Sequence, residues 1–152
     1  MQNTDFAWLA GFMEGEGTFS IYHQKRKGRD GDLLRATVSV ENTDPALIQH
    51  SVEIFESIGC TMHISTCMKA KSTKMVYRIG TANAIYVKVI CEVLIPYLFG
   101  EKLAKAKLLL SFVSKRLEKR QSNDKAYDAE TWNMFSNYNK NFRSSQTTRE
   151  TP

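Results

Sequence analysis

The sequence has few cysteines and no long apolar segment, and both absences exclude whole classes of protein. Its three cysteines are an odd number without a CxxC pair, which is untypical of a disulfide framework or a structural zinc site. No apolar run approaches the roughly 20 residues that would span a membrane. The opening segment MQNTDFAWLAGF has no positive charge before its apolar residues, unlike a signal peptide. We expect an intracellular protein, in the cytoplasm or nucleoid of a prokaryote or in an organelle, that is neither secreted nor bound to a membrane.

The sequence also lacks a Walker loop, a dinucleotide-binding glycine fingerprint and a Ser-His-Asp pattern, and its three histidines are too scattered for a metal cluster. No small-molecule substrate is therefore expected. The length of 152 residues fits a single domain with one core. We expect that core over about residues 5–120, a helical extension over about 121–140 and a mobile tail over 141–152.

Positive charge is concentrated in particular segments of the chain. The formal net charge is +5, from 21 Lys and Arg against 16 Asp and Glu. Residues 1–17 and 44–59 contain acids but no Lys or Arg, whereas residues 61–80 contain cations and no acid. Segregated positive charge is what a face that binds a polyanion requires.

Hydrophobic periodicity and turn signals predict a mixture of helices and hairpins. Asp5 is the expected cap of the first helix, and Gly15 and Gly17 are expected to end it. Thr81 and Asn83 are alternative caps for the third helix. The expected elements are a helix over 5–14, strands over 18–26 and 33–41, a helix from about 44 to 57, strands over 60–69 and 74–80, and helices over 82–94, 101–120 and 127–138.

Two hairpins imply antiparallel pairing, so the predicted fold class is α+β, with one curved antiparallel four-stranded sheet and additional C-terminal helices. Helices would cover one face of the sheet, and the other face would carry polar and basic side chains. In the second hairpin, alternation predicts that the buried face holds Met62, Ile64, Met68, Met75, Tyr77 and Ile79. A broad, curved, basic antiparallel face has a shape that can enter a DNA groove.

The segment LAGFMEGEG, residues 9–17, is the most informative stretch. Gly11 and Gly15 are four residues apart and share one helical face, although each glycine costs a helix about 1 kcal/mol relative to alanine. Close packing against a second helix would offset that cost. Because the chain contains only one such helix, the partner would be a second, identical subunit related by a two-fold axis. The expected interface residues are Leu9, Ala10, Gly11, Phe12 and Gly15.

Glu16 lies at the foot of this helix, between two glycines. In a two-fold dimer it would meet its twin near the axis, where two carboxylates repel each other. Hard divalent cations with oxygen ligands relieve that repulsion. Carboxylates that hold metal ions at the centre of a DNA-binding face form a phosphodiesterase arrangement, in which the metals activate water and stabilise the leaving oxygen. An ordinary helix that ends in a glycine-rich turn is the simpler interpretation, but it leaves the two spaced glycines and the acid unexplained.

The same stretch closely resembles the signature of the LAGLIDADG homing endonucleases. The helix–hairpin–helix–hairpin–helix order over about residues 5–120 is similar to that family's αββαββα core. A chain with one copy of the motif resembles the homodimeric members. The resemblance implies an intron- or intein-encoded enzyme that cleaves both strands of a long, near-palindromic DNA site with Mg²⁺, for which Mn²⁺ or Ca²⁺ can substitute. A non-cleaving DNA-binding protein or an RNA maturase on the same fold is the alternative.

The resemblance also implies roles for individual residues. Glu16 matches the metal-binding acid, although the commonest pattern has Asp there, and the Gly15 carbonyl matches a further metal ligand. Asn42 matches a polar amide that orders active-site water. Lys102 matches a basic residue that polarises water or the scissile phosphate. That alignment needs a one-residue shift after Pro96, so Glu101 and Lys105 are the alternatives for this position.

Outward-facing polar residues on the strands are the candidates for DNA contact, because Arg and Lys read guanine and Gln reads adenine in the major groove. A simple solvated sheet face is the alternative, and the acid-free hairpin at 61–80 argues against it. The candidate DNA-binding residues are Tyr22, Gln24, Arg26, Arg35, Thr37, Ser39, His63, Ser65, Lys69, Lys74 and Arg78.

Overall fold

The computed structural model of the chain describes residues 2–24, 33–118, 133 and 136. Its elements follow the predicted order: α1 (Asn3–Glu16), β1 (Gly17–Gln24), β2 (Leu33–Asn42), α2 (Pro45–Ser57), β3 (His63–Met68), β4 (Met75–Thr81), α3 (Ala84–Leu94), a short 3₁₀ helix η1 (Ile95–Tyr97) and α4 (Gly100–Glu118). The predicted α+β class is therefore confirmed. The expected helix over 127–138, the extension over 121–140 and the tail over 141–152 fall almost entirely outside the described residues. None of the described helices is both long and apolar enough to cross a membrane.

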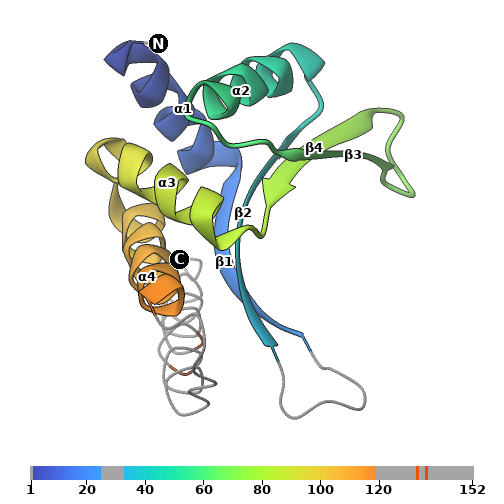
Figure 1. Cartoon of the computed structure of the whole chain (residues 1–152). Helices are drawn as coiled ribbons and strands as arrows, with labels where there is room; N and C mark the ends of the chain where they lie inside the picture. Colours follow the sequence, from blue (N-terminus) through green and yellow to red (C-terminus); the bar gives the residue numbers. More distant parts are fainter. Residues whose placement is uncertain (1, 25–32, 119–132, 134–135, 137–152) are drawn as a thin grey trace, which may run out of the picture.

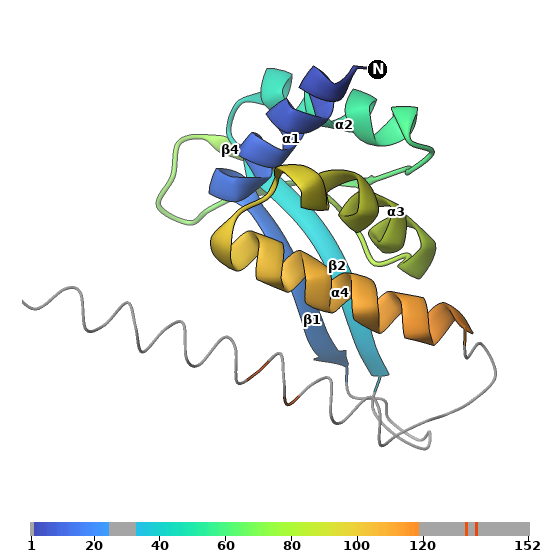
Figure 2. The ribbon, with the colours of Figure 1, turned by 90° about the vertical axis from the view of Figure 1, so that its left-hand side faces the viewer.

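The four strands form one antiparallel sheet in the order β1-β2-β4-β3. The two hairpins thus meet at β2 and β4, which places one strand of each at the centre of the sheet. Helices α1, α3 and α4 lie on one side of β1 and β2, and no described helix covers the opposite side (Figures 1 and 2). The polar and basic residues predicted for that side are consequently free of helical cover.

The helices begin where short polar side chains satisfy their first amide groups. Asp44 accepts a hydrogen bond from the amide of Ala46 at 2.9 Å, directly before the proline that opens α2. Asn83 accepts hydrogen bonds from the amides of Ile85 and Tyr86, so that, of the two predicted caps, Asn83 starts α3. The prediction for α1 was wrong in detail. Asp5 lies inside the helix and accepts a hydrogen bond from the amide of Gln2, the residue that precedes α1.

The hydrophobic core fills the space between the helices and the covered face of the sheet. Alternate residues of β1 and β2 point into it, as their period-two pattern predicted. Fully buried side chains from several elements meet there, among them Leu9, Met13, Phe19, Val38, Ile54, Phe55, Ile79, Ile90, Leu94, Leu109 and Phe112. This core fixes α1 against the sheet and, through α1, the position of the glycine-rich motif.

The apolar residues of the β3–β4 hairpin depart in part from the prediction. Met62 and Ile79 are buried, but Ile64, Met68 and Met75 are 54%, 58% and 38% exposed, so the prediction that these three face the core was wrong. Ile64 pairs with Ile79 and Met68 with Met75 across the hairpin, so these side chains share one face of the sheet as predicted. The hairpin extends away from the described helices, and none of these helices lies beside its turn (Figure 1).

Candidate active site and nucleic-acid interface

The end of α1 places the predicted metal-binding acid at the surface. The helix continues through Gly15 to Glu16, and β1 begins at Gly17, so the prediction that Gly15 ends the helix was wrong. Gly17 allows this abrupt change, because a Cβ there would lie 2.7 Å from the carbonyl oxygen of Met13. The Glu16 side chain is exposed, and within the described residues no hydrogen bond or ion pair holds its carboxylate. The carboxylate is thus available to a ligand.

The exposed face of α1 carries small residues. Ala7, Gly11 and Gly15 are exposed at successive four-residue intervals, and a Cβ added at either glycine would have no neighbouring atom within 4 Å. Within the described part of the subunit, the glycines at positions 11 and 15 therefore have no packing role.

Two other residues of the predicted dimer interface are buried in the core of the subunit. Leu9 and Ala10 are 0% exposed and have no surface to offer a second subunit, so the prediction that they contact one was wrong. They face the core because α1 turns that side to the sheet. Phe12 is half-buried and stacks on Trp8 with ring centroids 5.3 Å apart, which leaves it at the edge of the open face.

Lys102 reaches the motif from the first turns of α4. Its Nζ atom donates a hydrogen bond to the main-chain carbonyl of Gly17, the residue after Glu16. Burial lowers the pKa of Lys102, Lys105 lowers it further, and nearby carboxylates, those of Glu101 and Glu16 included, oppose the shift. Glu101 and Lys105 were the two alternatives to Lys102. They form an ion pair of 2.5 Å with each other. The structure thus brings Lys102 to the site.

Asn42 is the last residue of β2, two positions beyond Val40, which pairs with Gly17. It is therefore at the same end of the sheet as the motif. Its Oδ1 atom accepts a hydrogen bond from the amide of Asp44 at 2.8 Å, just before α2 begins. This bond uses the side-chain oxygen of Asn42, so both hydrogens of its side-chain amide are still available as donors.

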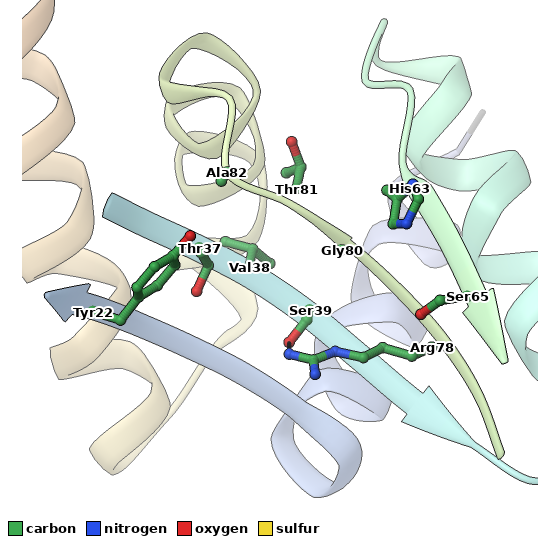
Figure 3. Close-up of a pocket in the computed structure, with 10 residues that line it drawn as sticks. All are labelled: Tyr22, Thr37, Val38, Ser39, His63, Ser65, Arg78, Gly80, Thr81 and Ala82. Carbon is green, nitrogen blue, oxygen red and sulfur yellow. Dashed lines mark hydrogen bonds between the residues drawn. The ribbon is translucent and has the colours of Figure 1, made fainter. Parts of the chain in front are cut away.

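The uncovered face of the sheet is hollowed at its centre, where β2, β4 and β3 run side by side (Figure 3). Arg78 extends across the hollow and donates a hydrogen bond from Nη2 to Ser39 Oγ at 3.3 Å. The Thr37 and Ser20 hydroxyls are 3.1 Å apart on the neighbouring strands. Polar groups and a cation therefore surround an open space of the kind that a base edge can enter. Six predicted DNA-binding residues line it: Tyr22, Thr37, Ser39, His63, Ser65 and Arg78.

The remaining predicted contacts surround this hollow or lie beyond the described part. Arg35 and Lys74 are exposed, and Lys69 lies 3.8 Å from Glu41 in an exposed ion pair. Gln24 is the last residue of β1, but its side chain is not described, and Arg26 lies outside the described residues.

Two features of the site were missing from the sequence-based prediction. Gly80 forms part of the hollow, and a Cβ there would lie 3.1 Å from Ser39 Cβ, so the glycine keeps β4 close to β2. A glycine inside a strand pattern often marks such a close approach, which could have indicated it. Glu14 accepts a hydrogen bond from the amide of Phe99, 85 residues away, at 2.6 Å. No local pattern signals a contact of that sequence separation.

The oxygen donors at the motif fit a hard divalent cation, although one subunit supplies few of them. The described residues contain no group of three or more His, Cys, Asp or Glu side chains that could hold a metal. Each subunit offers the Glu16 carboxylate, and the Gly15 carbonyl is at the same helix end, where the helix no longer uses its last carbonyl groups. Carboxylate and carbonyl oxygens are the ligands that Mg²⁺ and Ca²⁺ prefer. The chemistry of the donor set therefore fits, provided that DNA or a second subunit adds ligands.

Comparisons with known proteins agree with this geometry. The sequence model of the LAGLIDADG endonuclease matches residues 9–113. The fold is similar to that of the homing endonuclease I-CvuI in complex with DNA, at 21% identity and a TM-score of 0.68 over 91% of this chain and 83% of that one. No curated protein sequence matches the chain.

Two further DNA complexes have a similar fold. The intron-encoded homing endonuclease I-CeuI is 15% identical, with a TM-score of 0.62 over 78% of this chain and 57% of that one. The meganuclease I-SmaMI is 17% identical, with a TM-score of 0.64 over 88% of this chain and 42% of that one.

The chain belongs to the LAGLIDADG endonuclease family. It is a metal-dependent DNA endonuclease of the homing type, and the resemblance seen in residues 9–17 is confirmed over most of the chain.

Proposed function

We propose that the chain makes a site-specific double-strand break in a long, near-palindromic DNA site as a homodimer, and that Glu16 holds its catalytic metal. One observation carries the proposal. The exposed Glu16 carboxylate is next in the chain to Gly17, whose carbonyl accepts a hydrogen bond from the Lys102 ammonium, and the strand that begins there belongs to the sheet with the hollowed polar face. A metal-binding acid, a cation and a DNA-binding surface are the three parts that phosphodiester hydrolysis on DNA requires.

The homodimer is supported by the open face of α1. Glycines at positions 11 and 15 leave the backbone accessible, and a second copy of the same helix could approach it closely. The comparison with I-SmaMI points the same way, since this chain accounts for 42% of that protein's length. One subunit therefore corresponds to about half of a longer LAGLIDADG chain, and two subunits would complete the DNA-binding surface.

Glu16 and the Gly15 carbonyl would hold the metal in each subunit, with Mg²⁺ as the physiological ion and Mn²⁺ or Ca²⁺ as substitutes. When bound, the metal lowers the pKa of a water ligand and stabilises the leaving oxygen. Asn42 would orient the attacking water through its side-chain amide hydrogens, while its oxygen stays on Asp44. Lys102 has three N–H donors, of which Gly17 uses one, so it can also donate to a phosphate oxygen as charge develops there.

The sheet face would select the sequence. Arg78 is held by Ser39 with its fork directed across the hollow, which suits bidentate recognition of guanine. The exposed cations Lys69, Lys74 and Arg35 would contact phosphates or neighbouring bases. We place the enzyme inside the cell, and the three free cysteines are compatible with that location.

Glu16→Gln tests the proposal directly, because the amide keeps the shape of the side chain and removes its charge. Cleavage of a cognate duplex in Mg²⁺ is expected to fall at least about 100-fold, while DNA affinity in Ca²⁺ changes little. Glu56→Gln is the matched control, since Glu56 is an exposed acid on α2, and it should cut at the normal rate. Unchanged cutting by Glu16→Gln would overturn the metal site. DNA or RNA binding without cleavage by the unaltered protein, in Mg²⁺ and Mn²⁺, would favour a binding protein or maturase.

A further inference from the structure

The second acid of the motif, Glu14, connects the end of α1 to the start of α4. Its Oε1 atom accepts a hydrogen bond of 2.6 Å from the amide of Phe99. Phe99 immediately precedes α4, and its carbonyl accepts a hydrogen bond from the amide of Leu103 inside the first turn. A short bond from a carboxylate to a backbone amide is among the stronger hydrogen bonds in proteins. Glu14 therefore holds the point at which α4 begins.

A second connection joins the same two segments. The Lys102 ammonium, on the first turn of α4, donates to the Gly17 carbonyl at the start of β1. The two contacts lie on either side of Glu16 in the sequence. Glu14 of α1 accepts from the Phe99 amide, and Gly17 of β1 accepts from the Lys102 ammonium. A helix held at Phe99 has little freedom to move Lys102, only three residues further on, away from Glu16.

Other groups near the start of α4 do not make this connection. Glu101 and Lys105 pair with each other within the helix, at 2.5 Å. Phe99 is 73% exposed, so Glu14 holds this residue by its main-chain amide and not by its ring. Gly100 has a φ of 45°, a backbone conformation suited to glycine, and it makes the sharp turn into the helix. The chain bends at Gly100 directly after the residue that Glu14 holds.

We propose that Glu14 is a positioning residue that fixes the start of α4 through the Phe99 amide and thereby holds Lys102 beside Glu16. This inference rests on the proposed catalytic role of Lys102. It assigns the two acids of the motif different tasks: Glu16 contacts the metal, and Glu14 acts on catalysis only through Lys102.

The test is a double-mutant cycle on single-turnover cleavage in Mg²⁺. Glu14→Ala should slow cleavage about 10-fold to 100-fold, because a displacement of about 1 Å in a catalytic group has effects of that size. Glu14→Gln keeps an oxygen acceptor and should restore most of the rate. Lys102→Met should slow cleavage about 100-fold, and in that background Glu14→Ala should change the rate by less than about twofold, because residues that act as a unit are not additive. Additive effects of the two substitutions would overturn the proposal.

A second measurement is independent of metal and of cleavage. Hydrogen–deuterium exchange of the peptide that contains Phe99 should accelerate in Glu14→Ala and stay close to normal in Glu14→Gln, and thermal unfolding reports whether the remaining fold is intact. Glu56→Ala, which removes an exposed acid from α2, should affect neither exchange nor cleavage. Unchanged exchange in Glu14→Ala would overturn the role of Glu14 even if the enzyme cuts DNA. Conversely, absence of cleavage by the unaltered protein, with faster exchange in Glu14→Ala, would count against the proposed catalytic function and leave the contact between Glu14 and Phe99 established.

Discussion

Arg78 on β4 donates a hydrogen bond to the hydroxyl of Ser39 on β2, with Nη2 and Oγ 3.3 Å apart. Ser39 is only 8% exposed, so the bond anchors the guanidinium to a nearly immobile point in the middle of the polar sheet face. A guanidinium whose orientation is already fixed loses less entropy when it binds a base than a mobile one does. This pair is therefore expected to contribute more to DNA recognition than the exposed cations at the edge of the sheet.

Arg78→Ala should weaken binding of the cognate duplex by about 1–3 kcal/mol, the range for loss of a bidentate base contact. Arg78→Lys should recover part of the affinity but less of the specificity, since a lysine cannot make the planar two-point contact. Equilibrium binding in Ca²⁺ to duplexes changed at one base pair at a time would measure both. If Arg78→Ala weakened all duplexes equally, Arg78 would contact phosphate and not a base.

Lys74→Ala is the matched comparison. Lys74 is exposed at the end of the β3–β4 hairpin and has no side-chain anchor among the described residues. Its loss should weaken all sequences alike and make the dependence of affinity on salt less steep by about one counterion.

Asn42 has two separable contributions, because its oxygen and its amide hydrogens have different partners. Asn42→Asp keeps the acceptor for the Asp44 amide and removes the donors, so the free energy of unfolding should change little while cleavage slows. Asn42→Ala removes both, and should also lower the free energy of unfolding by about 1 kcal/mol. Chemical unfolding and single-turnover cleavage measure the two effects. Normal cleavage by Asn42→Asp would show that the donors have no role.

The sequence predicted most of the element order because its periodicities are clear. Val38 and Val40 alternate with polar residues, and Asp44 followed by Pro45 is a strong helix start. The sequence-based prediction of buried residues was wrong where burial depends on which helix covers the sheet or faces the core. Ile64 and Met68 follow the same alternation but lie beyond the helices, and Ala10 belongs to the core although it sits in the motif. Periodicity specifies a face and does not specify what covers it.

The exposed position of Glu16 beside the start of β1 was predictable because the motif specifies it within a few residues. Contacts between Lys102 and Gly17 or between Glu14 and Phe99 each span 85 residues, and they depend on how α4 packs against β1 and η1 against α1. A single sequence carries no local signal for such distances. Among the three candidates, Lys102 contacts Gly17, whereas Glu101 and Lys105 pair with each other.

Gly11→Leu should convert the proposed homodimer to a monomer without unfolding the subunit. A Cβ at position 11 would meet no atom within 4 Å, so a larger side chain fits the isolated subunit, and leucine favours a helix over glycine by up to about 1 kcal/mol. The same side chain would separate two helices that pack backbone to backbone. Sedimentation velocity and thermal unfolding would measure mass and stability together. Ala46→Leu, at an exposed position of α2, is the control and should stay dimeric. A Gly11→Leu monomer that still cuts both strands at once would refute the interface.

Phe112 connects α4 to the core, and its removal tests how much this buried ring contributes to stability. The ring is 1% exposed, and the Arg116 guanidinium lies over it, 4.8 Å from the ring centroid. Phe112→Ala should lower the free energy of unfolding by about 3–5 kcal/mol, because a cavity replaces a buried aromatic side chain. Phe99→Ala removes a ring of the same kind directly before α4, but Phe99 is 73% exposed and its amide remains available to Glu14, so stability should change by no more than about 0.5 kcal/mol. Urea unfolding of the two variants would give the difference. Equal losses of unfolding free energy in the two variants would mean that the Phe99 ring is buried in solution, for example against a second subunit.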